Sequence, residues 1–144
     1  MQNLPVTGAR RFMGRLDMGA DLLEALEEQC RVHSISLGEV RALGAVTKAR
    51  VGFYHQKERE YHFLDFDQPL EIVSLTGNIS LKDGRPLVHA HVTLADAAGR
   101  ALGGHLAPGT EVFACEFVIQ EYEAREALSR GFDEETGLFL WPKS

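Results

Sequence analysis

The sequence has no long hydrophobic run. A membrane-spanning helix needs roughly 20 consecutive apolar residues, and no segment of this chain approaches that length. Residues 1–8 have neither the basic start nor the apolar core of a secretory signal peptide. We therefore expect a cytoplasmic protein that has no membrane partner.

Cysteine is scarce. The two cysteines, Cys30 and Cys115, lie far apart in the chain and in unlike sequence contexts. Disulfides are rare in reducing compartments, and cysteine zinc sites need several thiolates at short spacing. We expect two buried free thiols, rather than a disulfide or a cysteine metal site.

Positive charge is also in short supply. The chain has 15 lysines and arginines against 21 aspartates and glutamates, so its formal net charge is -6. Nucleic-acid binders obtain most of their non-specific affinity from basic side chains that neutralise phosphates. The nearest approach to a basic patch is Arg10, Arg11 and Arg15, which fits equally well as the solvated face of a first strand. Charge therefore disfavours a DNA partner, although net charge does not exclude a local patch.

Several well-known catalytic and DNA-binding motifs are missing. There is no glycine-rich phosphate loop, nucleophile elbow or catalytic-cysteine context. The segment Asp83–Pro86 shares three letters with the Arg-Gly-Arg-Pro core of an AT-hook, but it lacks the first arginine and flanking basic residues. Because it lies between two strand-like segments, it is interpreted as a hairpin turn.

What the chain does contain is enough for one domain, residues 1–144, with an ordinary apolar content of 44%. The only clear helix is predicted from Asp21 to His33. Asp21 suits the N-cap, and Glu24 can complete a capping box. Leucines and Cys30 recur at helical spacing on one face of this segment, with charged residues on the other.

From Ile35 onward the pattern is that of β-structure. Glycines within a β-like run predict a bent or bulged pair of strands between Val40 and Tyr54. The strand-like segments are 9–16, 40–54, 61–66, 70–81, 86–94, 102–106 and 111–119. One helix followed by many strands and short turns predicts an α+β fold with a largely antiparallel sheet.

The C-terminal tail, residues 121–144, has a different character. Charged residues between Glu121 and Arg130 could form a short polar helical turn, and residues 138–142 are apolar. We expect this tail to dock on its own domain or on a neighbouring subunit.

Three histidines form the most informative pattern. His89 and His91 are two residues apart in a strand-like segment, so their side chains share one face. If the turn between Ala95 and Ala101 closes a hairpin, His91 lies directly opposite His105. Directly opposed residues share a sheet face with Cβ atoms roughly 5 Å apart. This register is an assumption, since a slip of one residue would turn His105 to the other face.

Three convergent imidazoles are a suitable ligand set for a metal with an open fourth position. Zinc is the first expectation, with iron, nickel and copper as alternatives. With water in the open position, such a site could supply a nucleophile near neutral pH. Gly103 and Gly104 could let a ligand or another backbone approach closely. Alternatively, the histidines are simply residues of a half-buried sheet face.

Other polar residues could have supporting roles. Ring orientation in a metal site needs hydrogen-bond partners for the histidines, and the candidate neighbours are Asn78, Thr93 and Glu116. His33 lies at the predicted helix end, where the helix dipole favours a positive charge. His55 and His62 flank a charged loop and are expected at the surface.

The order of these segments resembles the PPC (plants and prokaryotes conserved) domain family. The resemblance covers nearly the whole chain, and the pairing of His-x-His with Gly-Gly-His is typical of the prokaryotic branch. The matching stretches are residues 19–26, 43–54, 72–79, 86–91, 103–106, 108–109 and 133–138.

The resemblance implies a strongly bent antiparallel sheet, a homotrimer, and a metal, often zinc, on histidines that match His89, His91 and His105. In land plants the domain follows AT-hooks in nuclear proteins. There the hook contacts DNA and the PPC domain assembles the complex. This chain has no AT-hook, so the DNA contact is not carried over.

Three functions remain open from the sequence. The first is a homotrimeric metal-binding or regulatory module, to which a small-molecule ligand could bind. The second is a metal-dependent hydrolase or lyase that acts on a small molecule, with catalytic residues not assigned. The third is a DNA-associated protein.

Overall fold

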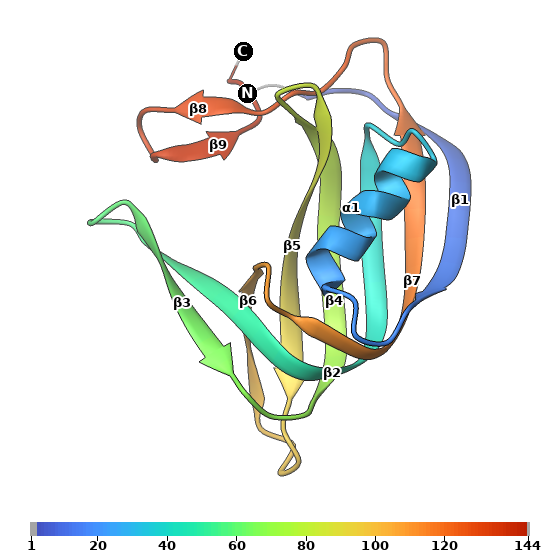
Figure 1. Cartoon of the computed structure of the whole chain (residues 1–144). Coiled ribbons are helices and arrows are strands. Elements are labelled where there is room, and N and C mark those ends of the chain that lie inside the picture. Colours follow the sequence, from blue (N-terminus) through green and yellow to red (C-terminus); the bar gives the residue numbers. More distant parts are fainter. Residues whose placement is uncertain (1–2, 144) are drawn as a thin grey trace.

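The computed structural model describes residues 3–143, which form a strongly bent, mainly antiparallel sheet with one helix beside it (Figure 1). Seven strands make the main sheet in the order β1-β7-β2-β4-β5-β6, and β3 pairs with β2. The predicted α+β class is confirmed. The elements are β1 (Thr7–Leu16), α1 (Leu22–Val32), β2 (Gly38–His55), β3 (Glu60–Phe66), β4 (Leu70–Lys82), β5 (Arg85–Ala95), β6 (Ala101–Leu106), β7 (Glu111–Glu123), β8 (Gly131–Asp133) and β9 (Leu138–Leu140).

The helix α1 is the predicted one. Asp21 is its N-cap, and its side chain accepts a hydrogen bond from the backbone N–H of Glu24 at 3.1 Å. Leu22, Leu26 and Cys30 are buried in the core against the sheet. Both Cys30 and Cys115 are buried and free, as the sequence predicted.

The strand β2 corrects one prediction, because it is a single strand of 18 residues rather than a pair. Its first half pairs with β4 and β7, and its second half pairs with β3 and, at Val51 and Gly52, with β6. The register shifts near Gly44, whose φ is 145°. A Cβ there would lie 2.0 Å from the carbonyl oxygen of Ala114, so only glycine fits this bend. The bend turns the sheet back on itself and brings β2 to β6.

The end of the chain corrects another prediction. In place of a polar helical turn after Glu121, β7 continues to Glu123, and a separate hairpin of β8 and β9 follows (Figure 1). Phe132 and Phe139 face each other across this hairpin, with ring centroids 5.6 Å apart. The segment leading to the hairpin lies along the end of β4, where Leu81 exchanges backbone hydrogen bonds with Leu128 and Arg130.

The arginines near the N-terminus are largely engaged. Arg10 forms a bidentate ion pair with Glu121, at 2.6 and 2.8 Å, and Arg11 donates to the side chain of Gln120 at 2.7 Å. They bind β1 to β7 rather than form a free basic surface. Within residues 3–143, no helix is long and apolar enough to cross a bilayer.

Candidate metal centre

The hairpin of β5 and β6 positions two of the three histidines. His91 pairs with His105 in the register that the sequence predicted, and Ala95 pairs with Ala101 at the turn. The Asp96 side chain fixes this turn, since its Oδ1 accepts the backbone N–H groups of Ala98 and Arg100, both at 2.9 Å. The tight turn therefore determines which histidines face each other.

The three imidazoles meet at one place. One ring nitrogen from each of His89, His91 and His105 can be chosen so that all lie within 4.8 Å of one another. Their ring centroids are 5.1 to 5.5 Å apart. Three nitrogens this close can occupy three corners of one tetrahedral coordination sphere.

The two glycines before His105 have a structural explanation. A Cβ at Gly103 would lie 2.1 Å from the carbonyl oxygen of Val92, and one at Gly104 would lie 2.8 Å from that of Gly52. Of the two roles considered for them, close approach of another backbone is the one observed. These glycines let β6 fit between β5 and the second half of β2, which delivers His105 to the cluster.

Burial favours the neutral form of two of the three imidazoles, those of His89 and His105. Burial is the main cause that lowers the pKa of His105 to about 4, and the neighbouring imidazoles and Arg130 act in the same direction. The pKa of His89 is also lowered, chiefly by burial. At neutral pH these two rings therefore have lone pairs available for a metal.

The Nδ1 atom of His105 provides a further test of fit. This nitrogen is buried and has no hydrogen-bond partner among the described residues. A buried polar atom without a partner costs free energy, and a bound cation would remove that cost for a ring nitrogen. The histidine donor set therefore fits a transition metal.

The three residues that were predicted to support the histidines lie in different places relative to the cluster. Asn78 pairs with His89 in the sheet, but its Oδ1 accepts a 2.6 Å hydrogen bond from Arg130. Thr93 follows His91 on the same strand face and is exposed. Glu116 is not a neighbour of the site, because β2 and β4 separate its strand β7 from β5. That part of the prediction is wrong because strands consecutive in sequence need not be adjacent in the sheet.

A cavity of about 650 Å³ opens beside the histidines. It lies where β5 extends beyond the end of β6. Val88 is in this extension, so β6 does not pair with its N–H group. Glu27 from α1 accepts this N–H at 3.2 Å. The cavity is lined by Leu23, Glu27, Tyr54, Gln56, Arg59, Glu60, Tyr61, Lys82, Leu87, Val88, His89, His91, His105, Arg130, Gly137, Leu138, Phe139 and Leu140.

Sequence reasoning missed Arg130 and Glu27. Arg130 comes from the segment before β8, and its guanidinium donates to Ser80 Oγ at 3.0 Å and to the carbonyl of Phe139 at 3.1 Å, as well as to Asn78. Only the three-dimensional fold brings this tail residue beside β4. Glu27 is one of the charged residues on the predicted outer face of the helix, but it is half-buried in the cavity wall, and burial raises its pKa.

The remaining histidines lie outside the cluster. His33 is the C-cap of α1 and stacks on Phe12, with centroids 4.3 Å apart. His55 and His62 lie on β2 and β3 with centroids 4.0 Å apart. His62 is exposed, as predicted, whereas His55 is only partly exposed.

Comparison with known proteins identifies relatives over almost the whole chain. The sequence profile of the Plants and Prokaryotes Conserved (PCC, also written PPC) domain matches residues 5–123. A crystal structure described as a metal-containing protein of Archaeoglobus fulgidus is 42% identical, with a TM-score of 0.93 over 99% of this chain and 100% of that one. A plant- and prokaryote-conserved protein of Pyrococcus horikoshii is 32% identical, with a TM-score of 0.93 over 100% and 99% of the two chains.

Other relatives have different descriptions. A candidate DNA-binding protein of Bacteroides thetaiotaomicron is 26% identical, with a TM-score of 0.85 over 95% and 96% of the two chains. The bifunctional protein GlmU of a Synechococcus strain is 34% identical over 137 residues, which are 94% of this chain. This chain spans only 21% of that curated relative.

Proposed function

The chain belongs to the Plants and Prokaryotes Conserved domain family, and from that premise we propose that it is a cytoplasmic, homotrimeric metal-binding module. His89, His91 and His105 would hold the ion, and zinc is the first candidate. The observation that carries the proposal is the meeting of three imidazole nitrogens within 4.8 Å at a half-buried site.

The chemistry of the residues supports this assignment. Neutral imidazoles suit zinc and several neighbouring transition metals. When bound, such an ion supplies a Lewis acid with a coordination position left for a ligand. His89 and His105 are held neutral by burial. Sheet pairing positions both, because His105 pairs with His91 across the β5–β6 hairpin and His89 pairs with Asn78 of β4. The relative from Archaeoglobus fulgidus, described as metal-containing, is consistent with this role.

Elemental analysis tests the metal centre directly. Protein purified without a nickel column should contain close to one equivalent of metal per chain, and His89→Ala and His105→Ala should contain none. His62→Ala is a matched control, since His62 is exposed and pairs with Glu60. Metal-free wild-type protein that stays folded after incubation with Zn²⁺, Fe²⁺, Ni²⁺ or Cu²⁺, and binds none of them, would refute the site.

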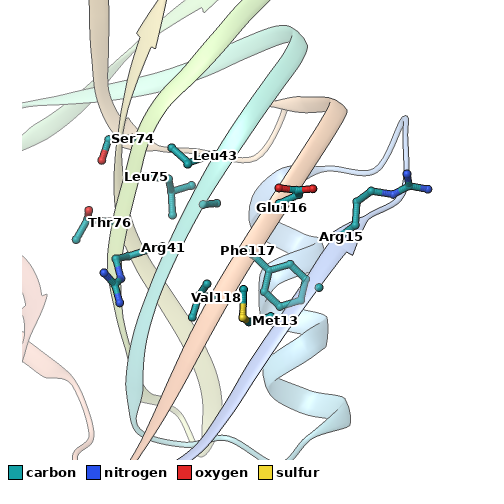
Figure 2. Close-up of a pocket in the computed structure, with 12 residues that line it drawn as sticks. Met13, Arg15, Arg41, Leu43, Ser74, Leu75, Thr76, Glu116, Phe117 and Val118 are labelled. Atoms are coloured by element: carbon teal, nitrogen blue, oxygen red, sulfur yellow. The ribbon is translucent and has the colours of Figure 1, made fainter.

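An apolar groove supports the self-association that the trimer requires. Figure 2 shows the groove, of about 680 Å³, on the sheet face opposite α1. Met13 is 79% exposed and Leu43 is 60% exposed, and both residues line the groove with Val118. Apolar surface of this kind is suited to contact between protein chains. Copies of this chain are the occupant we propose.

A DNA-binding role has weaker support. Two relatives are described as candidate DNA-binding proteins. In this chain, however, the net charge is -6, and Arg10 and Arg11 are engaged by side chains of β7. A mobility-shift titration at low salt checks this, because phosphate-dominated binding would be strongest there.

The position of Glu27 favours a second candidate function, a metal-dependent hydrolase or lyase. Its half-buried carboxyl lines the histidine cavity, and burial raises its pKa, which is the direction that favours proton transfer by a carboxyl group. A panel of ester, phosphate and amide substrates tests this reading. Any turnover should be lost in Glu27→Gln and in His91→Ala, and turnover that survives both substitutions would exclude this centre as its source.

A further inference from the structure

The cavity beside the histidines has more positively than negatively charged side chains in its wall. Resting on the proposed metal centre, we propose that this cavity binds a small molecule in which an oxyanion, a carboxylate or a phosphate, is attached to an apolar body. Arg130 would pair with the oxyanion beside the metal.

The cavity wall has more cations than available carboxylates. Arg59, Lys82 and Arg130 all line it, and none of them forms a salt bridge within residues 3–143. The two carboxylates of the wall are already engaged. Glu27 accepts the N–H of Val88, and Glu60 pairs with His62 at 2.8 Å.

Arg130 is the cation that is best placed to hold an anion. It is half-buried, and its three protein partners, Ser80, Asn78 and the carbonyl of Phe139, are all uncharged. A half-buried guanidinium without a counter-ion is unfavourable, so pairing with an oxyanion would stabilise it.

The guanidinium also retains hydrogen-bonding capacity. It has five N–H groups, and the three bonds use one on Nε and one on each terminal nitrogen. One N–H therefore remains on each terminal nitrogen. Those bonds also hold the guanidinium in a fixed orientation, which lowers the entropy that binding would cost.

The other residues of the cavity wall indicate what the remainder of the ligand, apart from the oxyanion, should be. Leucines from α1, β5 and β9 line the cavity together with Phe139, Tyr54 and Tyr61. Its volume of about 650 Å³ is in the range of small-molecule sites and exceeds the need of a free inorganic ion. The ligand should therefore have an apolar or aromatic portion besides the oxyanion.

Three probes of similar shape but different charge test whether the cavity selects an anion. Benzoate and phenyl phosphate carry the two oxyanions, and benzamide is the neutral analogue. Each is titrated by calorimetry, at constant ionic strength, into Zn²⁺-loaded and metal-free protein. Trp141 gives a second signal, because Arg130 lies 5.5 Å from its ring. We expect at least one anionic probe to bind at least tenfold more tightly than benzamide, and the stronger of the two identifies the oxyanion.

Arg130→Gln should reduce the affinity for that probe at least tenfold while metal content, measured on the same samples, stays unchanged. Arg130→Lys should give an intermediate loss, because it keeps the charge without the planar fork. Arg31→Gln is the matched control, since Arg31 is exposed on α1, does not line the cavity and forms an ion pair with Glu28. It should bind as wild type does.

The possible failures are distinguishable. Metal-loaded wild-type protein that binds benzoate and phenyl phosphate no better than benzamide overturns this inference and leaves the metal centre intact. The same holds for full anion affinity in Arg130→Gln. Arg130-dependent anion binding in a protein that takes up no metal would instead overturn the metal centre. The comparison of charged and neutral probes needs no variant, so misfolding of Arg130→Gln cannot hide the answer.

Discussion

At the scale of single residues, burial determines which protonation state each titratable group holds. The same effect that keeps His105 neutral makes the two cysteines inert. Burial raises the pKa of Cys30 to about 12 and that of Cys115 to about 11. Because the thiolate is the reactive form, neither residue should act as a nucleophile or a metal ligand near neutral pH.

A thiol titration checks this expectation. Native protein at pH 8 should react with Ellman's reagent only over hours, whereas both thiols should react at once in guanidinium chloride. The denatured sample serves as the internal control for total thiol content. Rapid reaction of even one thiol in the native state would mean that burial does not protect it, and would reopen the question of a cysteine ligand.

At the scale of elements, two short structural features place the histidines. One is the Asp96 turn of the β5–β6 hairpin. The pKa of Asp96 is lowered, first by the backbone N–H of Arg100 and then by the Arg100 side chain. A depressed carboxyl pKa contributes stability above its unfolded value near 4, and this stability is lost as pH falls through the folded pKa.

Asp96→Ala should therefore lower the Tm at pH 7, where wild-type Asp96 is ionised. The difference in Tm between the two proteins should begin to shrink below about pH 4, where unfolded Asp96 becomes protonated. It should disappear as the pH falls through the lower folded pKa of Asp96. Asp67→Ala, in the exposed link between β3 and β4, is the control and should change little. A Tm difference that does not vary with pH would show that the charge of Asp96 plays no part in the turn.

The second feature is the bend of β2 at Gly44. Gly44→Ala forces a Cβ against the Ala114 carbonyl in an unfavourable backbone conformation, so the free energy of unfolding should fall by more than about 2 kcal/mol. Gly131→Ala is the control, since nothing lies within 4 Å of its Cβ and its φ is not positive. Urea unfolding measures both. Near-wild-type stability of Gly44→Ala would mean that the bend does not depend on glycine.

These two elements also show what sequence could and could not reveal. The helix limits, the hairpin turn at Asp83 and the pairing of His91 with His105 were predictable, because capping, turn chemistry and alternation are local signals. The continuity of β2 was not, since glycines in a β-like run fit a turn as well as a bulge. Arg130 was missed because its place in the cavity depends on packing against a strand 50 residues earlier.

At the scale of the whole molecule, the proposed trimer depends on the exposed sheet face that carries the groove, because this face would contact the other copies of the chain. If copies of the chain cover the groove of Figure 2, a charge placed there would have to be buried without a partner, at a cost of several kcal/mol. Leu43→Glu and Met13→Glu should therefore convert the trimer to monomer. Met18→Glu is the matched control, because Met18 is 70% exposed and lies in the turn before α1, away from the groove residues.

Sedimentation velocity at micromolar concentration gives the mass of each species. Wild type and Met18→Glu should sediment at about three times the 16.0 kDa of one chain, and the two groove variants at the single-chain mass. Circular dichroism should show that all four remain folded, since both groove side chains are exposed in the single chain. A monomeric wild type would end the trimer proposal, and trimeric groove variants would move the interface to another face.

The metal content of the monomeric groove variants would show whether one chain supplies every ligand. We expect that it does, because His89, His91 and His105 converge within a single chain.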